Sequence, residues 1–560
     1  MHPNGPALIV ERVRNLGMKF GLWFSVSGAG WSCGEFPAVE PSFAPSPGGP
    51  DETTSHGVVY RNGYIADGGV PGQLCVASEP YFSILKNAVL YHVRQNNLKF
   101  FKLDIGNYYC NSTHHGHLPG KYSVEAMYER LIEIAKSARE AEPDIYVMWY
   151  WGIRSPFFAL YGDSIFESGL FMEGSGTSWF PTLYYRDSVT LNLDQSTQFA
   201  KTIPPINKDS LGVWLSDIRW GNFMGNERWR EALIMDLGRG NLLFPQIWSD
   251  IYLLSDRDVE FLVEMISLVK KNEFVLLKPR HRLGDPWRND VYGYSYFDGA
   301  HGFIFINNVH FGSRKLELRL GPDTGLDAAP GTPVQIVSLF PERKQLIPVG
   351  GVTFKVGESA EVWVRPFEVL MLEVVPAATL FGFPPRQLVA EQAAGLGISL
   401  PLQSAPLANW MDIRLADAAR FEGQGYQRKP AAWTTSLPPL EGEQHLLAVV
   451  VRLREDDAEW LYSPAAVEIV QAIARIGEQK IPLIPVPDAR QFGNTQKAGC
   501  SWVVYRARLN SRWSGQRLQF AVLAYLPEAV KPHVEAWVVR QWWEESARPL
   551  GDGYYGDAPS

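Results

Sequence analysis

The chain has 560 residues, enough for roughly two to four domains. Its 52 Lys and Arg stand against 60 Asp and Glu, so the net charge of −8 gives no basic excess for nucleic acid or an anionic membrane surface. No apolar run is long enough to span a bilayer, and the N-terminus lacks a signal-peptide pattern. Four cysteines are too few for a disulfide scaffold, so we expect a cytoplasmic protein.

The first half of the chain alternates helix and strand patterns. A helix is predicted over residues 6–16, followed by a continuous apolar strand over 18–26, the type buried on both faces of a parallel sheet. After a Gly-, Ser- and Pro-rich loop, a helix over 80–97 leads into the strand 98–106. Ser123 is expected to N-cap the next helix.

Further strands and a closing helix complete this half. The predicted segments are the strands 144–152, 163–171, 210–218 and 241–248 and the helix 256–272. Such repeats predict either a (β/α) barrel or a doubly wound sheet. No GxGxxG loop follows any strand, which disfavours a nucleotide-binding sheet. We therefore predict an α/β fold, a (β/α)8-type TIM barrel, over residues 1–272.

The pattern changes after residue 272. Alternating strands separated by turn residues predict an antiparallel β-sandwich over 273–376. A linker rich in Pro, Ala and Gly is expected over 377–410. Further strands between 411 and 560 predict an accessory β-rich module.

Three segments resemble a known family. "HPNGPALIVERVRNLGMKFGLWFS", "FFKLDI" and "WREALIMDLGRGNLLF" occur in the order found in melibiase-type α-galactosidases, which are family-36-like glycoside hydrolases of clan D. The resemblance covers about residues 1–375 and implies barrel strands 3 to 8 followed by the family's C-terminal β-domain. It implies a retaining α-glycoside hydrolase, α-galactosidase-like, that acts on oligosaccharides by double displacement without a cofactor.

The resemblance also assigns catalytic residues. Asp104 ends the strand that carries the family's nucleophile. Lys102 lies on the same side of that strand, and the resemblance implies that it binds substrate, because the family has a lysine at this place in its sugar site. A retaining glycosidase needs a second carboxyl group as acid/base. The sequence departs from the family here, so Glu173 is the first candidate, Glu167 the second and Asp217 the third, with Asp217 otherwise a substrate-binding residue.

A cluster of histidines follows Asp104. Cys110, His114, His115 and His117 offer mixed Cys/His ligands for zinc. All four lie in one loop with no partner pair elsewhere in the sequence, whereas structural zinc sites usually join two segments. We therefore expect no metal, and we expect His115 and His117 to hydrogen-bond sugar hydroxyls.

Aromatic rings are the remaining candidates for substrate contacts. Trp23, Trp149 and Trp151 are candidates, because a ring near a strand end can stack on the C–H face of a sugar. Core packing is the alternative for each, and only one of Trp149 and Trp151 is expected to face the site. The expected partner is a carbohydrate substrate, and we expect no binding to nucleic acid or membrane. The chain could also form a homo-oligomer.

The resemblance leaves the barrel incomplete at its N-terminus. The family has an N-terminal β-domain and two more strands, the second with an acidic pair that binds sugar, before the helix at which this chain starts. The chain therefore resembles the later part of a longer protein. A non-catalytic glycan-binding protein derived from the same fold is the alternative function.

Overall fold

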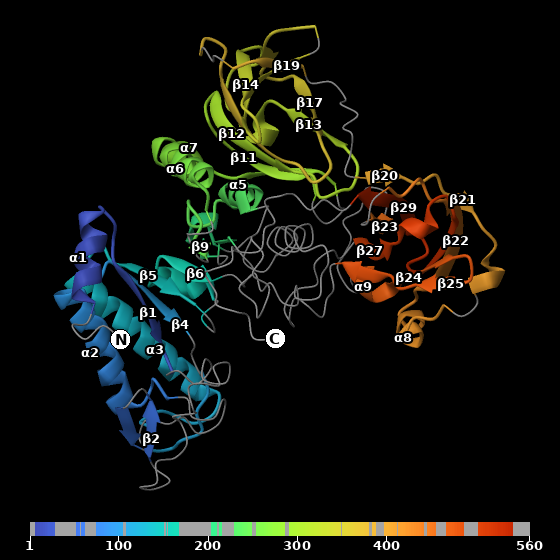
Figure 1. Ribbon diagram of the computed structural model, residues 1–560. Helices are drawn as coiled ribbons and strands as arrows, with labels where there is room; N and C mark the ends of the chain where they lie inside the picture. Colours follow the sequence, from blue (N-terminus) through green and yellow to red (C-terminus); the bar gives the residue numbers. More distant parts are fainter. Residues whose placement is uncertain are drawn as a thin grey trace. The chain divides into compact units, whose positions relative to one another are not determined.

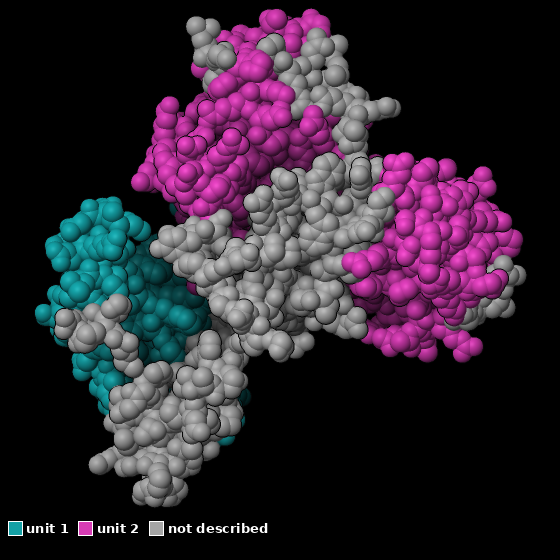
Figure 2. All heavy atoms as spheres, viewed as in Figure 1, with its two compact units in different colours: residues 1–169, 198–210 teal, residues 170–197, 211–560 magenta. Residues whose placement is uncertain are grey.

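A computed structural model describes most of the chain. It covers residues 6–27, 52–55, 58–61, 74–104, 108–150, 153, 155–166, 203–209, 212–215, 229–248, 254–285, 290–348, 350–379, 383–387, 397–410, 413–441, 445–454, 466–486 and 502–540. The chain divides into two compact units, residues 1–169 with 198–210 and residues 170–197 with 211–560 (Figure 2). Among the described helices, none has the length and apolar character needed to cross a membrane.

A five-stranded parallel sheet forms the centre of the first unit (Figure 1). Its strands, in spatial order, are β1 (Gly21–Ser25), β4 (Phe100–Asp104), β5 (Tyr146–Trp149), β6 (Ser164–Phe166) and β7 (Lys208–Asp209). The first three form within predicted apolar runs. Strands β2 (Glu52–Ser55) and β3 (Val58–Arg61) form a separate antiparallel pair.

In the described part of the first unit, three α-helices and two short 3-10 helices accompany the parallel sheet. They are α1 (Ala7–Asn15), α2 (Glu79–Gln95) and α3 (Tyr122–Ala141), with the short 3-10 helices η3 (Pro156–Leu160) and η5 (Pro205–Asn207). Apolar side chains of α2 and α3 pack with the strands in one buried cluster. Ser123 was expected as an N-cap but lies inside α3, because its hydroxyl donates to Gly120 O instead of capping the helix.

The second unit begins with a short parallel pair and a buried helix. Its elements before the β-domains are β8 (Val213–Trp214), β9 (Ile247–Trp248), α5 (Trp229–Arg239), α6 (Asp256–Lys271) and α7 (Glu273–Leu276). A capping box of Ser255 and Asp258 starts α6. The described residues of 1–272, where a barrel is predicted, thus show a five-stranded parallel sheet and the two separate pairs β2–β3 and β8–β9. No closed barrel is formed by these described strands.

A β-domain follows, in which every described strand pair is antiparallel except the short parallel pair β15–β19. One sheet has the order β10-β11-β12-β18-β14-β15-β19 with β16 beside β14, and β13 pairs with β17. The bounds are β10 (His281–Leu283), β11 (Tyr292–Asp298), β12 (His301–Asn307), β13 (Arg314–Arg319), η8 (Pro322–Thr324), β14 (Pro333–Phe340), β15 (Lys344–Ile347), β16 (Phe354–Lys355), β17 (Ser359–Val364), β18 (Val369–Pro376) and β19 (Pro385–Gln387).

The C-terminal module consists of two five-stranded sheets, β20-β29-β23-β27-β26 and β21-β22-β28-β24-β25. Their elements are β20 (Gly397–Ser399), β21 (Gln403–Ser404), η9 (Leu407–Trp410), α8 (Ala418–Gly423), β22 (Gln427–Ser436), β23 (His445–Arg454), α9 (Ala466–Ile469), β24 (Val470–Ile476), β25 (Gln479–Ile481), β26 (Ile484–Val486), β27 (Trp502–Leu509), η11 (Ser511–Trp513), β28 (Arg517–Leu526) and β29 (Lys531–Arg540). Residues 397–404, expected as part of a linker, supply the edge strands β20 and β21 because their backbone pairs with β29 and β22.

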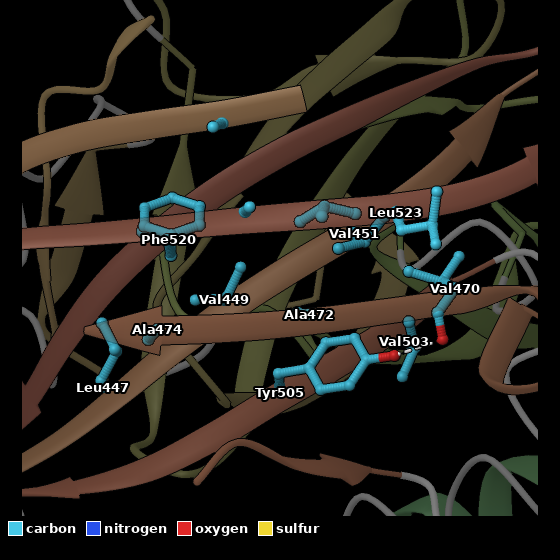
Figure 3. Packing of buried hydrophobic residues seen from close by; sticks show 14 of the residues in the cluster. Leu447, Val449, Val451, Val470, Ala472, Ala474, Val503, Tyr505, Phe520 and Leu523 are labelled. Atoms are coloured by element: carbon cyan, nitrogen blue, oxygen red, sulfur yellow. Dashed lines mark hydrogen bonds between the residues drawn. The ribbon is translucent and has the colours of Figure 1, made fainter. Parts of the chain in front are cut away.

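The core of this module lies between apolar faces of the two sheets. Val449 and Val451 of one sheet lie close to Ala472 and Leu523 of the other (Figure 3). Tyr505 is buried with them, and its hydroxyl donates a 2.6 Å hydrogen bond to Val470 O. This bond satisfies the polar end of an otherwise apolar side chain.

Candidate active site

The register of the parallel sheet places the predicted nucleophile. Lys102 pairs with Trp23 of β1 and with Met148 of β5, and Asp104 pairs with Ser25. Side chains alternate along a strand, so Lys102, Asp104 and Trp23 lie on one face of the sheet. Asp104 is the last residue of β4, at the carboxyl edge where parallel α/β folds place their ligands.

Lys102 is the centre of a buried polar cluster. Its Nζ lies 3.2 Å from Asp104 Oδ2, and both side chains are almost fully buried. The same Nζ lies 3.3 Å from the ring centroid of Tyr150 and 5.0 Å from that of Trp23. The ammonium thus contacts one carboxylate and two aromatic faces, an arrangement that favours its charged form.

Asp209 joins this cluster from the far edge of the sheet. It pairs with Phe166, whose ring stacks on Tyr150 at a centroid distance of 4.1 Å, and its side chain is fully buried. We define the Lys102 cluster as Lys102, Asp104, Tyr150 and Asp209. The sequence analysis missed Asp209, because β7 is a two-residue strand with two charged residues and no apolar run.

The pKa values of the cluster report opposing effects. Burial lowers the pKa of Lys102, while Asp104 and Asp209 act to raise it. Burial raises the pKa of Tyr150 far above its usual value, and the nearby carboxylates of Asp209 and Asp104 add to this. Tyr150 is therefore neutral at all physiological pH values, and the ammonium of Lys102 is the positive charge that faces Asp104 and Asp209.

The tryptophans predicted to contact substrate differ in position. Trp23 lies on the face of Lys102 and is 57% exposed, so its ring is accessible. The prediction for Trp149 is wrong: it is fully buried, and its indole N–H donates to Phe158 O over 2.9 Å. Trp149 pairs with Leu103, so strand alternation directs it to the face opposite Lys102.

The predicted histidines lie beside two thiols. His117 Nε2 is 3.3 Å from Cys75 Sγ, and His115 Nδ1 is 3.5 Å from Cys110 Sγ. His114 is exposed and lies outside this group. We expected every Cys and His side chain of this group to come from one loop. That expectation is wrong, because Cys75 precedes α2 in a different segment.

Several predicted residues lie outside the described residues. These are the acid/base candidates Glu173, Glu167 and Asp217, and Trp151. The structure thus brings together Asp104, Lys102 and Trp23 and adds Tyr150 and Asp209. The identity of the carboxyl group that acts as acid/base therefore stays a prediction.

Comparison with known proteins finds distant structural similarity only. No protein-family model matches the chain, and no curated protein matches it. A family 27 β-L-arabinopyranosidase from Geobacillus stearothermophilus is 14% identical, with a TM-score of 0.42 over 68% of this chain and 79% of that one. A variant family 36 α-galactosidase from the same organism, solved with raffinose, is 14% identical, with a TM-score of 0.42 over 67% of this chain and 47% of that one.

An α-amylase from Geobacillus thermoleovorans, solved with acarbose, is 11% identical, with a TM-score of 0.40 over 66% of this chain and 80% of that one. The chain thus spans about half the length of the α-galactosidase and about four-fifths of the other two. All three are glycoside hydrolases, but TM-scores of 0.40 to 0.42 leave the family of this chain open.

Proposed function

We propose that this chain is a retaining glycoside hydrolase with Asp104 as its nucleophile. The observation that carries the proposal is the position of Asp104, buried at the carboxyl end of β4 with Lys102 Nζ 3.2 Å from its Oδ2. The adjacent ammonium favours the ionised carboxylate, which is the form a nucleophile needs. The resemblance of "FFKLDI" to the nucleophile strand of melibiase-type enzymes supports the same role.

The reaction follows the two steps of double displacement. In the first, the Asp104 carboxylate attacks the anomeric carbon, and the bond to the leaving oxygen breaks as an acid, Glu173 in this proposal, donates its proton to that oxygen. In the second, the Glu173 carboxylate takes a proton from water, the water oxygen bonds to the anomeric carbon, and the ester to Asp104 breaks. The enzyme returns to its starting state, so no cofactor is consumed.

The proposed substrate is an α-galactoside within an oligosaccharide. Trp23 offers an exposed ring on the face of the sheet that carries Asp104, where it can stack on a sugar. Lys102 Nζ lies 5.0 Å from the centroid of that ring and 3.2 Å from Asp104 Oδ2, so in this proposal its positive charge lies next to the bound sugar. The choice of galactose rests on the sequence resemblance alone.

Covalent labelling tests this proposal directly. A 2-deoxy-2-fluoro-α-galactosyl fluoride that reacts as substrate should leave a glycosyl ester on Asp104, detectable as a mass increase on the peptide that contains residues 100–104. Asp104→Asn should abolish labelling, whereas Asp144→Asn, which changes an exposed carboxylate in the same unit, should leave it intact. Binding of the sugar without any ester would instead identify a non-catalytic glycan-binding protein.

A further inference from the structure

Four metal-ligating side chains from two segments converge in the first unit. Cys75 precedes α2, while Cys110, His115 and His117 belong to the loop between β4 and α3. One potential ligand atom from each residue lies within 4.8 Å of all the others. We call these residues the Cys75 cluster. Neither of its two cysteines forms a disulfide in the structure.

The spacing of the ligand atoms fits a tetrahedral zinc ion. With Zn–S bonds near 2.3 Å and Zn–N bonds near 2.0 Å, neighbouring ligand atoms around zinc lie about 3.3–3.8 Å apart. The distance from Cys75 Sγ to His117 Nε2 is 3.3 Å, and that from Cys110 Sγ to His115 Nδ1 is 3.5 Å. The cluster is thus already close to the size that zinc requires.

The tautomer of His117 is also set for metal binding. Its Nδ1 lies 2.9 Å from the backbone oxygen of Leu118. A carbonyl oxygen can only accept a hydrogen bond, so Nδ1 carries the proton and Nε2 keeps a lone pair. That lone pair lies on the side of Cys75 Sγ. A hydrogen bond from the second ring nitrogen to a backbone carbonyl is typical of zinc-bound histidine.

The loop that carries three of the ligands is closed by its own hydrogen bonds. Gly120 N donates to Cys110 O at 2.9 Å, and Cys110 N donates to Ser123 Oγ at 2.9 Å. Ser123 Oγ in turn donates to Gly120 O at 2.7 Å. Gly116 and Gly120 have φ angles of +78° and +69°, which side chains rarely adopt. These bonds therefore close the loop that carries Cys110, His115 and His117 without an ion.

Hydrogen bonding alone is a weak explanation for this cluster. Cys75, Cys110 and His115 are buried, and the two cysteines belong to the apolar core of the unit. A thiol is a poor hydrogen-bond donor and acceptor, so the contact of His115 with the Cys110 thiol recovers little of the cost of burying that imidazole. Coordination to one cation satisfies all four groups.

We propose that Cys75, Cys110, His115 and His117 bind one zinc ion. Two thiolates with two imidazoles form a soft ligand set that disfavours Mg²⁺ and Ca²⁺, which prefer oxygen. Four protein ligands leave no position for water or substrate, so the ion is structural rather than catalytic. It fastens the loop that follows Asp104 to the segment before α2, and this role does not rest on the proposed hydrolase activity.

Metal analysis of the full chain tests the proposal. Protein purified without a metal-affinity step or chelator should contain about one zinc per chain. The double variant His115→Ala/His117→Ala should retain less than about a tenth of that, while the matched control His114→Ala, an exposed histidine of the same loop, should retain all of it. Stoichiometric zinc that survives in the double variant would overturn the assignment.

A measurement on the unaltered chain covers the case in which the double variant does not fold. Cys75 and Cys110 should resist alkylation in the zinc-loaded protein and become labelled after treatment with a strong chelator. Cobalt(II) added to the chelated protein should give the visible absorption and the thiolate-to-metal charge-transfer band of a tetrahedral site. Protein free of zinc as purified, or a disulfide between Cys75 and Cys110 in fresh protein, would show that the cluster is not a zinc site.

Discussion

Lys102 Nζ lies 3.2 Å from Asp104 Oδ2, and the two residues are only 8% and 4% exposed. Both extend from the same face of β4, so the strand itself fixes their separation. A buried ion pair is weak evidence for stability, because desolvation offsets much of its Coulombic gain. Its place at the carboxyl edge of a parallel sheet is better explained by function, and two variants separate these effects.

The first prediction concerns the nucleophile. Asp104→Asn should lower kcat/KM on aryl α-galactosides by at least about a thousandfold, because the amide is nearly isosteric with the carboxylate but is not nucleophilic. Circular dichroism should show an unchanged fold. Steady-state kinetics of this variant beside Asp144→Asn provides the measurement. Activity within about tenfold of the parent would remove Asp104 from the mechanism.

The second prediction concerns the cation. Lys102→Met leaves Asp104 and Asp209 buried without a positive charge and should destabilise the unit by about 3 kcal/mol at pH 7. Without the ammonium, burial and the neighbouring charge of Asp209 favour the neutral form of the Asp104 carboxyl group. A carboxyl group whose folded pKa is raised penalises the folded state above that pKa, and the penalty vanishes below the unfolded pKa. The deficit should therefore shrink as the pH falls toward about 4.

Thermal unfolding of Lys102→Met and Lys102→Arg at several pH values measures this effect. The arginine variant keeps the charge, so its deficit should not depend on pH. If the variants are active, the acidic limb of the kcat/KM profile should move to higher pH in Lys102→Met only. A deficit in Lys102→Met that stays constant from neutral to acidic pH would indicate lost packing rather than lost charge.

The third prediction concerns the proton donor. Glu173→Gln should slow hydrolysis of glycosides with poor leaving groups far more than that of activated aryl glycosides, because a good leaving group needs little protonation. Comparison of kcat/KM across a series of leaving groups measures this. Glu167→Gln and Asp217→Asn belong in the same series, and whichever variant alone shows the pattern identifies the acid.

The sequence predicted the parts of the fold that carry strong local patterns. Strands β4 and β28 lie within apolar runs, and α2 and α6 have an amphipathic pattern with clear start signals. Strand β7 has no such pattern, because two charged residues pair with β6 only through the tertiary arrangement. Asp209 could not be placed beside Lys102 for that reason.

The candidate sites show the same limit. Asp104 and Lys102 could be found together because they are two residues apart on one strand. Cys75 could not be joined to Cys110, because a long segment separates them in the sequence and no spacing motif links them. Trp149 was misassigned because the face to which it points depends on the register between strands, which a single sequence does not fix.

A second buried ionic group joins the two β-modules of the second unit. Glu535 of β29 accepts hydrogen bonds from Arg452 and Arg314, and His310 Nε2 lies 3.2 Å from its Oε2. Burial acts to raise the pKa of Glu535, but the hydrogen bond from His310 and the neighbouring positive charges hold it well below its usual value. Glu535 therefore stays ionised throughout the range in which His310 titrates.

The last prediction concerns His310. Gly312 N donates to its Nδ1 at 2.9 Å, so the imidazole is neutral. Its Nε2 lies 3.2 Å from Glu535 Oε2 and 2.9 Å from Arg314 Nη2. Burial is the main cause that lowers the pKa of His310 from 6.5 to about 4, and the charges of Arg314 and Arg452 add to it, while Glu535 acts to raise it. In the unfolded chain His310 is therefore protonated below about pH 6.5, whereas in the folded chain it is protonated only below about pH 4.

Stability is therefore lost as the pH falls through this window, at about 1.4 kcal/mol per pKa unit, which amounts to about 3 kcal/mol. His310→Gln keeps an N–H donor for Glu535 but cannot titrate. It should be less stable than the parent at pH 7, by about 1 kcal/mol for the lost acceptor of Gly312 N–H, yet lose less stability on acidification. Urea unfolding followed by circular dichroism at several values between pH 7 and 4 measures both slopes. Parallel slopes for parent and variant would show that His310 titrates at its ordinary pKa, and that its burial against Glu535 costs the folded chain nothing in acid.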